Sequence, residues 1–389
     1  MTPDDDQSSP ASGASPKPTP DPATESEPSN KLGAIVHLWA TAVIVLLVVA
    51  GFVLVSGAYL DKLAAIERHA ARSDPGPPPA SRTAATPGDP TASPVEVKVG
   101  MYLDRVVNLS VKETGWTADF YLWFSWRKKE LDPGASFRIV GGDIEQKDTL
   151  KTEDLPDGSR YALYRVRARI TKAFDVSRFP ADDHLLNINL EDAALTRDRL
   201  QFVADTANSA VSSRVQLPGY RIQRVSAIVK PHAYKTTLGD PRLAKGTQAE
   251  YSQYSFGIWI ARDGWAYFFK VFQGLYAAVA VALLAFFIKP TDVDPRFGLG
   301  VGGFFGAIAN GYIIASLLPD TGIVSLADKI NGLGLAMIFL TLVQSTISLY
   351  LYDIRGEEAL SRRFDRVSVL ILIPGYIILN VLIAWAAAV

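Results

Sequence analysis

The stretch PRFGLGVGGFFGAIANGYIIASLLPD at residues 295–320 decides which kind of fold this chain can adopt. Between Arg296 and Pro319 it holds 22 consecutive residues without a charged side chain. As an α-helix these residues would be about 33 Å long, at a rise of about 1.5 Å per residue, which is enough to cross the hydrocarbon core of a bilayer. The stretch therefore predicts a membrane-spanning helix over residues 297–318.

Four more segments have the length and apolar character of membrane spans, which need about 20 helical residues. They cover residues 32–60, 267–288, 330–352 and 367–389. The first lacks a basic n-region and follows an acidic segment, so we interpret it as an uncleaved anchor; a signal peptide cleaved near residues 55–58 is the alternative. The other spans are expected to form a four-helix transmembrane bundle over residues 263–389.

Basic residues in the connections between spans set the expected orientation, because they favour the cytoplasmic side. They gather after the second and the fourth span: Lys289, Arg296, Arg355, Arg362, Arg363 and Arg366. The N-terminus is then cytoplasmic, whereas residues 61–266 and the C-terminus lie on the outer side.

The segment before residue 95 has parts of different character. Residues 1–31 are mostly Pro, Ser, Asp and Glu and are expected to be a disordered cytoplasmic tail, because this composition cannot offset the entropy of folding. Residues 61–72 continue the helical spacing of the first span, and residues 73–94 are rich in Pro and Ala. Residues 61–94 therefore predict a helical extension followed by a semi-stiff linker.

Residues 95–262 show the alternation of a sheet protein. Apolar side chains occupy every second position at residues 95–101, 186–190 and 256–260, which predicts strands with one buried face. Turn signals such as DPG at residues 132–134 separate the strands. Many short strands predict an antiparallel β-sandwich, so the fold class is a mixed membrane protein: a sandwich outside the bilayer, a four-helix bundle and one N-terminal transmembrane helix.

The composition gives no sign of an enzyme or a metalloprotein. The chain has no cysteine, its net charge is −1, and its 4 histidines are scattered. Neither an H-E-x-x-H nor a G-x-S-x-G motif occurs, and no basic run suggests nucleic acid. We therefore expect no catalytic residue, no metal site, no cofactor and no nucleic-acid partner.

Four local motifs follow one another in an order that is typical of one receptor family. They are FPADDH at residues 179–184, Arg262, PRFGLG at residues 295–300, and LLP at residues 317–319 with Asp328 after it. They are similar to the core of a signature loop, the arginine that closes the last outer strand, the start of a pore helix, and the end of that helix with the turn that follows. By these motifs, residues 95–389 resemble the pentameric ligand-gated ion channels (the Cys-loop receptor superfamily) in their cysteine-free prokaryotic form.

The chain departs from the family pattern in several features, which include Lys128 in place of the aspartate of a W-x-D pattern that starts at Trp126, and the absence of the usual proline in the first pore-domain helix. The cysteines that flank the signature loop in animal members fall at Lys172 and Leu186, so this loop (residues 172–186) has no disulfide. The family does not require the extra span at residues 32–60.

The resemblance implies a homopentamer in a bacterial inner membrane. Its subunits would sense a small-molecule or proton agonist and pass inorganic ions across the lipid bilayer. The alternative is a non-conducting, membrane-anchored receptor or binding protein of the bacterial envelope, which the same outer domain would serve.

Aligned on its Arg296 and Pro319 matches, the helix over residues 297–318 presents one face to a pore. The expected pore-lining and gate residues are Asp294, Arg296, Gly298, Gly302, Phe305, Ala309, Tyr312 and Ser316. A ring of Phe305 side chains could close the path by dewetting. Asp294 at the inner mouth would favour cations and Arg296 anions, and we favour cations. The glycine spacing also suits plain packing between membrane helices, which keeps the non-conducting alternative open.

In the family, the ligand lies under a hairpin between the last two outer strands, which corresponds here to residues 234–254. Tyr234, Tyr251 and Tyr254 could form an aromatic box for an amine through cation–π attraction. Trp123 and Tyr121, on an earlier strand, are candidates for the opposite wall. The alternative is that all of these aromatic residues only pack the sheets.

Protonation is the other trigger that the sequence suggests. Acidic residues and a histidine lie close together in the sequence, and we expect them near the membrane-facing end of the outer domain, where their titration would change the packing. They are Asp182, Asp183, His184, Glu191 and Asp192.

Coupling between the outer domain and the pore is expected at the signature loop. Phe179 and Pro180 should rest on the turn at residues 319–322, which begins with Pro319 and Asp320. Arg262 should pair with an acid such as Asp182. Motion of the outer domain would then act on the outer end of the pore helix.

Overall fold

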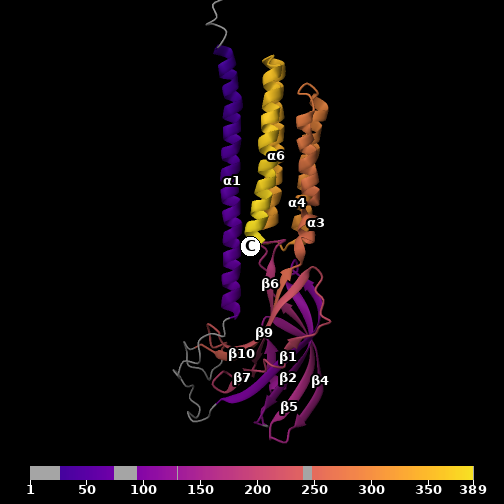
Figure 1. Ribbon diagram of the computed structural model, residues 1–389. Helices are drawn as coiled ribbons and strands as arrows, with labels where there is room; N and C mark the ends of the chain where they lie inside the picture. Colours follow the sequence, from indigo (N-terminus) through magenta and orange to yellow (C-terminus); the bar gives the residue numbers. More distant parts are fainter. Residues whose placement is uncertain (1–26, 74–93, 129, 240–247, 389) are drawn as a thin grey trace, which may run out of the picture.

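The computed structural model describes residues 27–73, 94–128, 130–239 and 248–388. The chain is elongated, with long helices at one end and a domain of β-sheets at the other (Figure 1). The greater part of the expected tail and linker, residues 1–26 and 74–93, lies outside the described residues.

Five of the described helices are long and apolar enough to cross a membrane. They are α1 (Glu27–Ser73), α3 (Gly264–Leu283), α4 (Val293–Leu317), α5 (Leu326–Leu349) and α6 (Glu358–Ala388). A 3-10 turn, η1 (Leu284–Phe287), extends α3, and a π-helical turn, η2 (Tyr350–Ile354), extends α5. The starts of α4, α5 and α6 precede the expected residues 297, 330 and 367, because polar first turns continue each helix beyond its apolar run. At α5, Ser325 and Asp328 form a capping box that fixes this start.

Helix α1 differs from the expectation at its first residues. It begins at Glu27, so residues 27–31 are helical and do not belong to a disordered tail. Pro28 is compatible with this start, because the first turn of a helix needs no backbone N–H from the proline. The helix then runs without interruption through residues 61–73.

The sheet domain consists of two sheets. One has the strand order β4-β5-β2-β1-β7, with β8 also paired to β1, and the other has the order β3-β6-β10-β9. The strands of the first are β1 (Val95–Ser110), β2 (Gly115–Trp126), β4 (Gly142–Asp154), β5 (Arg160–Thr171), β7 (Leu200–Ala204) and β8 (Ala210–Val211). Those of the second are β3 (Phe137–Ile139), β6 (Asp183–Asp192), β9 (Tyr220–Ala233) and β10 (Glu250–Arg262), and one helical turn, α2 (Pro133–Ser136), precedes β3.

Both sheets contribute alternate side chains to one core. Phe120, Leu122 and Phe124 from β2 are fully buried, as are Leu186, Ile188 and Leu190 from β6. The sheet domain is not antiparallel throughout, because β7 and β8 both run parallel to β1. The chain reaches β7 from β6, a strand of the other sheet, and such a crossover allows the parallel direction.

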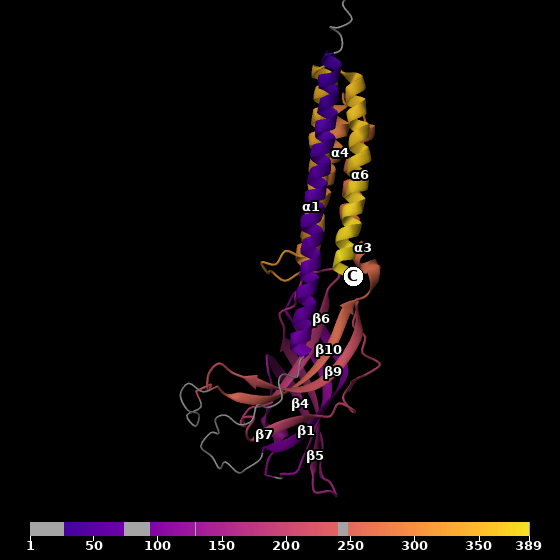
Figure 2. The same ribbon diagram turned by 60° about the vertical axis from the view of Figure 1, so that its left-hand side comes forward.

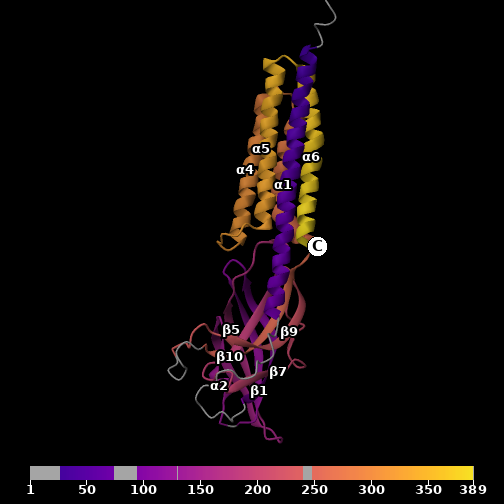
Figure 3. The same cartoon turned by 90° about the vertical axis from the view of Figure 1, so that its left-hand side faces the viewer.

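The sheet domain joins the helices where β10 ends at Arg262 and α3 begins at Gly264. Helix α1 packs mainly against α6 (Figures 1 and 3). In Figure 2, α1 continues past the end of α6 and runs alongside the sheet domain.

Candidate functional site

Helix α4 has one packed side and one open face within the subunit. The packed side consists of Gly300, Gly303, Ala307 and Ile314, together with the polar Asn310, all of them buried. At Gly303 an added Cβ would lie 2.7 Å from Ala278 O, so a glycine is needed for α3 and α4 to approach this closely. At Gly298 and Gly302 an added Cβ would meet nothing within 4 Å. The glycines of α4 therefore serve two different surfaces.

The open face carries all but one of the residues that we expected to line a pore. It consists of Asp294, Gly298, Gly302, Phe305, Ala309, Tyr312 and Ser316, all of them exposed. Phe305 is 66% exposed and Tyr312 is 75% exposed. Aromatic side chains exposed in a row on one helix face indicate a surface that is covered by lipid or by other subunits.

Arg296 is the exception, and its placement corrects the expectation that it lines the pore. Its side chain is fully buried between α4 and α6. Nη2 donates to Asp365 Oδ1 at 2.9 Å, and Nη1 donates to Asp365 Oδ2 at 3.1 Å and to Ile288 O at 3.0 Å. Gln344 also donates to the Asp365 carboxylate. A buried guanidinium needs such a bidentate partner, and Asp365 supplies it from inside the subunit.

Asp294 lies in the first turn of α4 and is exposed at the end of the open face. A carboxylate is favourable there, because the N-terminus of a helix carries partial positive charge. With Arg296 turned into the subunit, Asp294 supplies the charge of the open face at this end.

A polar and aromatic cluster lies near the hairpin between β9 and β10, on the face of the second sheet that points away from the first sheet. The tyrosine cluster comprises Arg138, Glu191, His232, Tyr234, Tyr251 and Gln253. The rings of Tyr234 and Tyr251 lie 5.6 Å apart, edge to face, and His232 lies 4.5 Å from Tyr234. The Arg138 guanidinium lies 5.5 Å from the Tyr234 ring and 5.2 Å from the Tyr251 ring. The cation that an aromatic box would attract is thus already present as a side chain.

Glu191 is the buried acceptor that connects the other members of this cluster. Its side chain is fully buried and accepts hydrogen bonds from Gln253 Nε2 at 2.8 Å, Tyr234 OH at 2.9 Å and Arg138 Nη2 at 3.2 Å. His232 Nδ1 also contacts the carboxylate. Burial, together with the hydrogen bond to Glu191, raises the pKa of Tyr234 to about 12, so Tyr234 stays a donor at neutral pH.

The other predicted ligand residues lie elsewhere. Tyr254 is on the opposite face of β10, fully buried in the core, with its hydroxyl 3.1 Å from Ser209 Oγ. Strand alternation explains this, because Tyr251 and Tyr254 are an odd number of residues apart and so point to opposite faces. Trp123 and Tyr121 lie on β2, in the other sheet, where Trp123 Nε1 donates to Asp205 Oδ2 at 3.1 Å. The structure therefore brings together only Tyr234 and Tyr251 of these five residues.

At the membrane-facing end of the sheet domain, Asp182 forms a buried polar centre. Arg262 Nε donates to Asp182 Oδ1 at 2.9 Å, so the expected pair of Arg262 with an acid is present. His184 Nε2 lies 2.6 Å from Asp182 Oδ2, and Tyr220 OH donates to the same oxygen at 3.3 Å. Burial alone would raise the pKa of Asp182, but the hydrogen bond from His184 and the charges of His184 and Arg262 outweigh it and lower the pKa to about 2.

The signature loop lies on the helices next to this centre. Leu326 N donates to Ser177 O at 2.8 Å, and Ala327 N donates to Phe179 O at 3.0 Å. The Phe179 ring lies 6.0 Å from the ring of Tyr267 on α3. Among the described residues, the backbone hydrogen bonds between the loop and the helices thus go to the start of α5 and not to the expected turn at residues 319–322.

That turn is less involved than we expected. Pro319 is half-buried and Asp320 is exposed, whereas Pro180, the neighbour of Phe179, is buried. The free N–H groups at the start of α5 explain the difference, because the first turn of a helix must find acceptors outside the helix.

The acidic residues that we grouped as one proton sensor are two separate groups. Asp182 lies directly before β6 and His184 lies at its start, next to the helices, whereas Glu191 and Asp192 lie at the other end of the strand. Strand residues rise about 3.3 Å each, so the two groups are about 25 Å apart. Glu191 and Asp192 are therefore not near the membrane-facing end, and Glu191 belongs to the tyrosine cluster.

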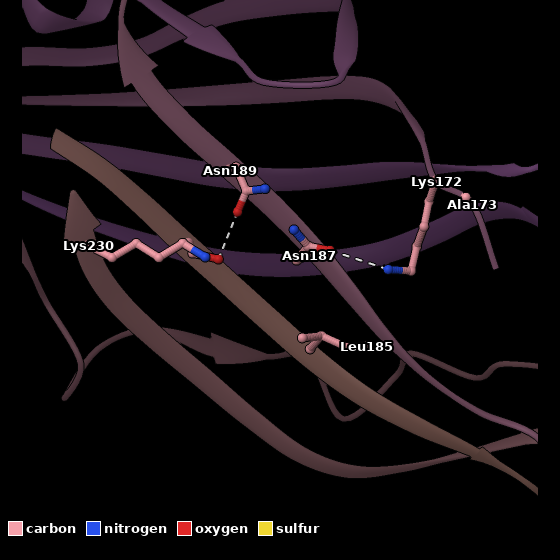
Figure 4. A pocket seen from close by; sticks show the side chains of 7 residues that line it. Lys172, Ala173, Leu185, Asn187, Asn189 and Lys230 are labelled. Atoms are coloured by element: carbon pink, nitrogen blue, oxygen red, sulfur yellow. Dashed lines mark hydrogen bonds between the residues drawn. The ribbon is translucent and has the colours of Figure 1, made fainter. Parts of the chain in front are cut away.

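Figure 4 shows the surroundings of Lys172, the first of the two positions that correspond to the cysteines of the signature loop in animal members. Lys172 Nζ donates to Asn187 Oδ1 at 3.5 Å, beside a hollow of about 330 Å³. Ser255 and Asn189 also line this hollow, and Ser255 Oγ donates to Asn189 Oδ1 at 2.8 Å. Leu186, the second expected cysteine position, is fully buried in the core. Polar contacts and core packing thus hold the two ends of this loop in place, without a disulfide.

Two important partners were not predicted from the sequence. Asp365 lies 69 residues after Arg296, and Arg138 lies on a strand of 3 residues. Asp365 lies among the arginines that precede the expected last span, so its sequence context does not distinguish it from a solvated charge. No local pattern marks Arg138 either.

Comparison with known proteins gives one informative relative. No protein-family model matches the chain. The chain is 22% identical over 329 residues to a proton-gated ion channel of Gloeobacter violaceus, and the match covers 79% of this chain and 88% of the relative. This similarity confirms the resemblance to the pentameric ligand-gated ion channels that the motifs indicated.

Proposed function

We propose that the chain is one subunit of a homopentameric ligand-gated ion channel of the bacterial inner membrane. The open face of α4 is the observation that carries this proposal. Within one subunit, α3 and α5 cover the packed side of α4, whereas Phe305 stays 66% exposed and Tyr312 75% exposed among the described residues. Five copies that turn this face to a common axis would cover it and line a pore, with the Phe305 ring as a hydrophobic gate.

We propose that the pore prefers cations. Arg296 cannot present its charge to the axis while it is buried against Asp365. Asp294 is exposed in the first turn of the same helix. A ring of five carboxylates at one mouth would concentrate cations and repel anions.

The trigger is proposed to act on the tyrosine cluster, and a proton suits it better than an amine. Arg138 already occupies the position over the Tyr234 and Tyr251 rings that a ligand cation would take. Protonation of Glu191 would remove the negative charge that attracts Arg138, whereas protonation of His232 would add a second positive charge to the cluster that already holds Arg138; either change would favour release of Arg138 or the hairpin. Four groups face Glu191: Arg138 from β3, His232 from β9, Tyr234 directly after β9, and Gln253 from β10. The name of the relative, a proton-gated ion channel, agrees with this trigger.

Thiol modification of α4 tests the proposed pore. The chain has no cysteine, so a single cysteine reacts without background. Ala309→Cys places the thiol on the open face, and Ala307→Cys, the matched control, places it in the packed side, where Ala307 is 0% exposed.

We expect a charged methanethiosulfonate to block current through Ala309→Cys channels and to leave Ala307→Cys channels unchanged. Block in both variants, or in the control alone, would contradict this orientation of α4. Absence of current in the wild type and both variants, over all pH steps, would favour the non-conducting receptor.

A further inference from the structure

The outer end of α1 extends well beyond any membrane. The helix has 47 residues and is therefore about 70 Å long, more than twice the roughly 30 Å of a hydrocarbon core. Asp61 forms an ion pair with Lys329, whose Nζ lies 2.6 Å from Asp61 Oδ2. Lys329 is in the first turn of α5, so this ion pair marks the outer end of the helix bundle. The residues after Asp61 add about 18 Å of helix at a rise of about 1.5 Å each.

This projecting part of α1 lies against the signature loop. Arg68 forms an ion pair with Asp175, and His69 Nδ1 lies 3.6 Å from Asp183 Oδ2. Asp183 also binds Arg178 Nη1 at 2.6 Å, and Arg178 Nη2 donates to Ala387 O, at the end of α6, at 2.9 Å. The loop that contacts the start of α5 is thus held by α1 and α6 as well.

Within the membrane part, α1 is in close contact with α6. Trp39 Nε1 donates to Ser368 Oγ at 3.1 Å, and its ring lies 5.5 Å from Phe364. At Gly375 an added Cβ would lie 2.7 Å from Leu47 Cδ1, so the backbone of α6 fits closely against that side chain. The same side of α1 therefore follows α6 along its length before it reaches the loop.

We propose that α1 is part of the coupling machinery, and that Arg68 is a positioning residue that holds the signature loop through Asp175. This inference rests on the proposed channel function. The pair is partly exposed, with 44% and 31% of the two side chains accessible, so its loss changes folding stability little. A change of about twofold per subunit in the open–closed equilibrium would still multiply to about thirtyfold over five subunits that move together.

A double-mutant cycle separates this role from general damage. The variants are Arg68→Gln, Asp175→Asn and the pair together, with Arg68→Lys as the conservative rescue. Asparagine at 175 can still accept the hydrogen bond from Ser177 N, which Asp175 Oδ1 accepts at 3.0 Å, so the local turn is kept. Glu67→Gln, at the exposed neighbouring position, is the matched control.

Two readouts are taken on the full-length protein: the proton concentration for half-maximal current, and hydrogen exchange of the backbone at residues 173–182. We expect Arg68→Gln to shift the midpoint by at least threefold and to speed exchange in the loop. In the Asp175→Asn background, Arg68→Gln should change neither the midpoint nor the exchange any further. Arg68→Lys and Glu67→Gln should give the midpoint and the exchange of the wild type.

Unchanged midpoint and exchange in Arg68→Gln, or equal effects with and without Asp175, would overturn the proposal. The exchange readout needs no current. A silent wild type whose loop loses protection in Arg68→Gln would therefore contradict the channel function while the contact of α1 with the loop stands. A silent wild type with unchanged exchange would contradict both.

Discussion

Asp182 shows how one residue can join the sheet domain to the helices. It is buried and contacts His184, Tyr220 and Arg262 at once, and Arg262 also lies 4.4 Å from the Tyr267 ring of α3. Its pKa is about 2, so it stays ionised at any pH at which the protein would work. Asp182 is therefore not expected to be the proton sensor, and its charge is a fixed part of the coupling site.

Asp182→Asn should destabilise the sheet domain by about 3 kcal/mol, because Arg262 loses its buried partner. A carboxylate whose pKa is lower in the folded state stabilises the fold above the unfolded pKa of about 3.9, and this stabilisation is lost as the pH falls toward about 2. The difference in thermal midpoint between wild type and Asp182→Asn should thus persist at pH 5 and be lost only at lower pH. A difference that disappears between pH 7 and pH 5 would contradict the low pKa.

The sequence predicts the residues of this site better than those of the tyrosine cluster. Asp182 and Arg262 lie in motifs whose order indicates a shared interface, and the structure shows their ion pair. Arg138 is a single arginine on a short strand, and only the pairing of β3 with β6 brings it to Glu191. Contacts made by strand pairing over a long sequence distance leave no local pattern that could be read in advance.

Among the elements, α4 shows most clearly what glycine spacing can and cannot predict. Its glycines occur on both sides of the helix, so the sequence alone allows either side to face the bundle. The structure distinguishes them, because Gly303 lies against Ala278 O, whereas Gly302 lies in open space. The burial of Arg296 depends on α6, and no pattern within α4 predicts it.

These adjacent glycines provide a matched pair of substitutions. Gly303→Ala should destabilise the helix bundle by about 1–3 kcal/mol, because the new methyl group overpacks the contact between α3 and α4. Gly302→Ala makes the same chemical change one residue away and should be tolerated, since its Cβ meets nothing. The measurement is the thermal midpoint of each purified variant in detergent. Equal losses in both variants would show that the α3–α4 contact is not specific to Gly303.

Across the full length of the chain, the membrane spans were predicted well from the sequence, whereas the contacts between them were not. All five expected spans are helices, because a long apolar run has few alternatives in a membrane. That α1 reaches the signature loop was not predicted, since it depends on ion pairs between residues about one hundred positions apart. The parallel strands β7 and β8 were missed for a similar reason, because strand direction depends on the path between the sheets.

The central proposal is that five copies of the open face of α4 enclose a cation pore gated at Phe305. The most direct measurement is the current across a planar bilayer that contains the purified protein, for wild type and Phe305→Ala, during steps from pH 8 to pH 4 in a potassium chloride gradient. We expect acid to open the wild type, current to reverse close to the potassium potential, and Phe305→Ala to conduct more or to open without acid. Silence of both proteins over this range, or reversal close to the chloride potential, would contradict the proposed pore.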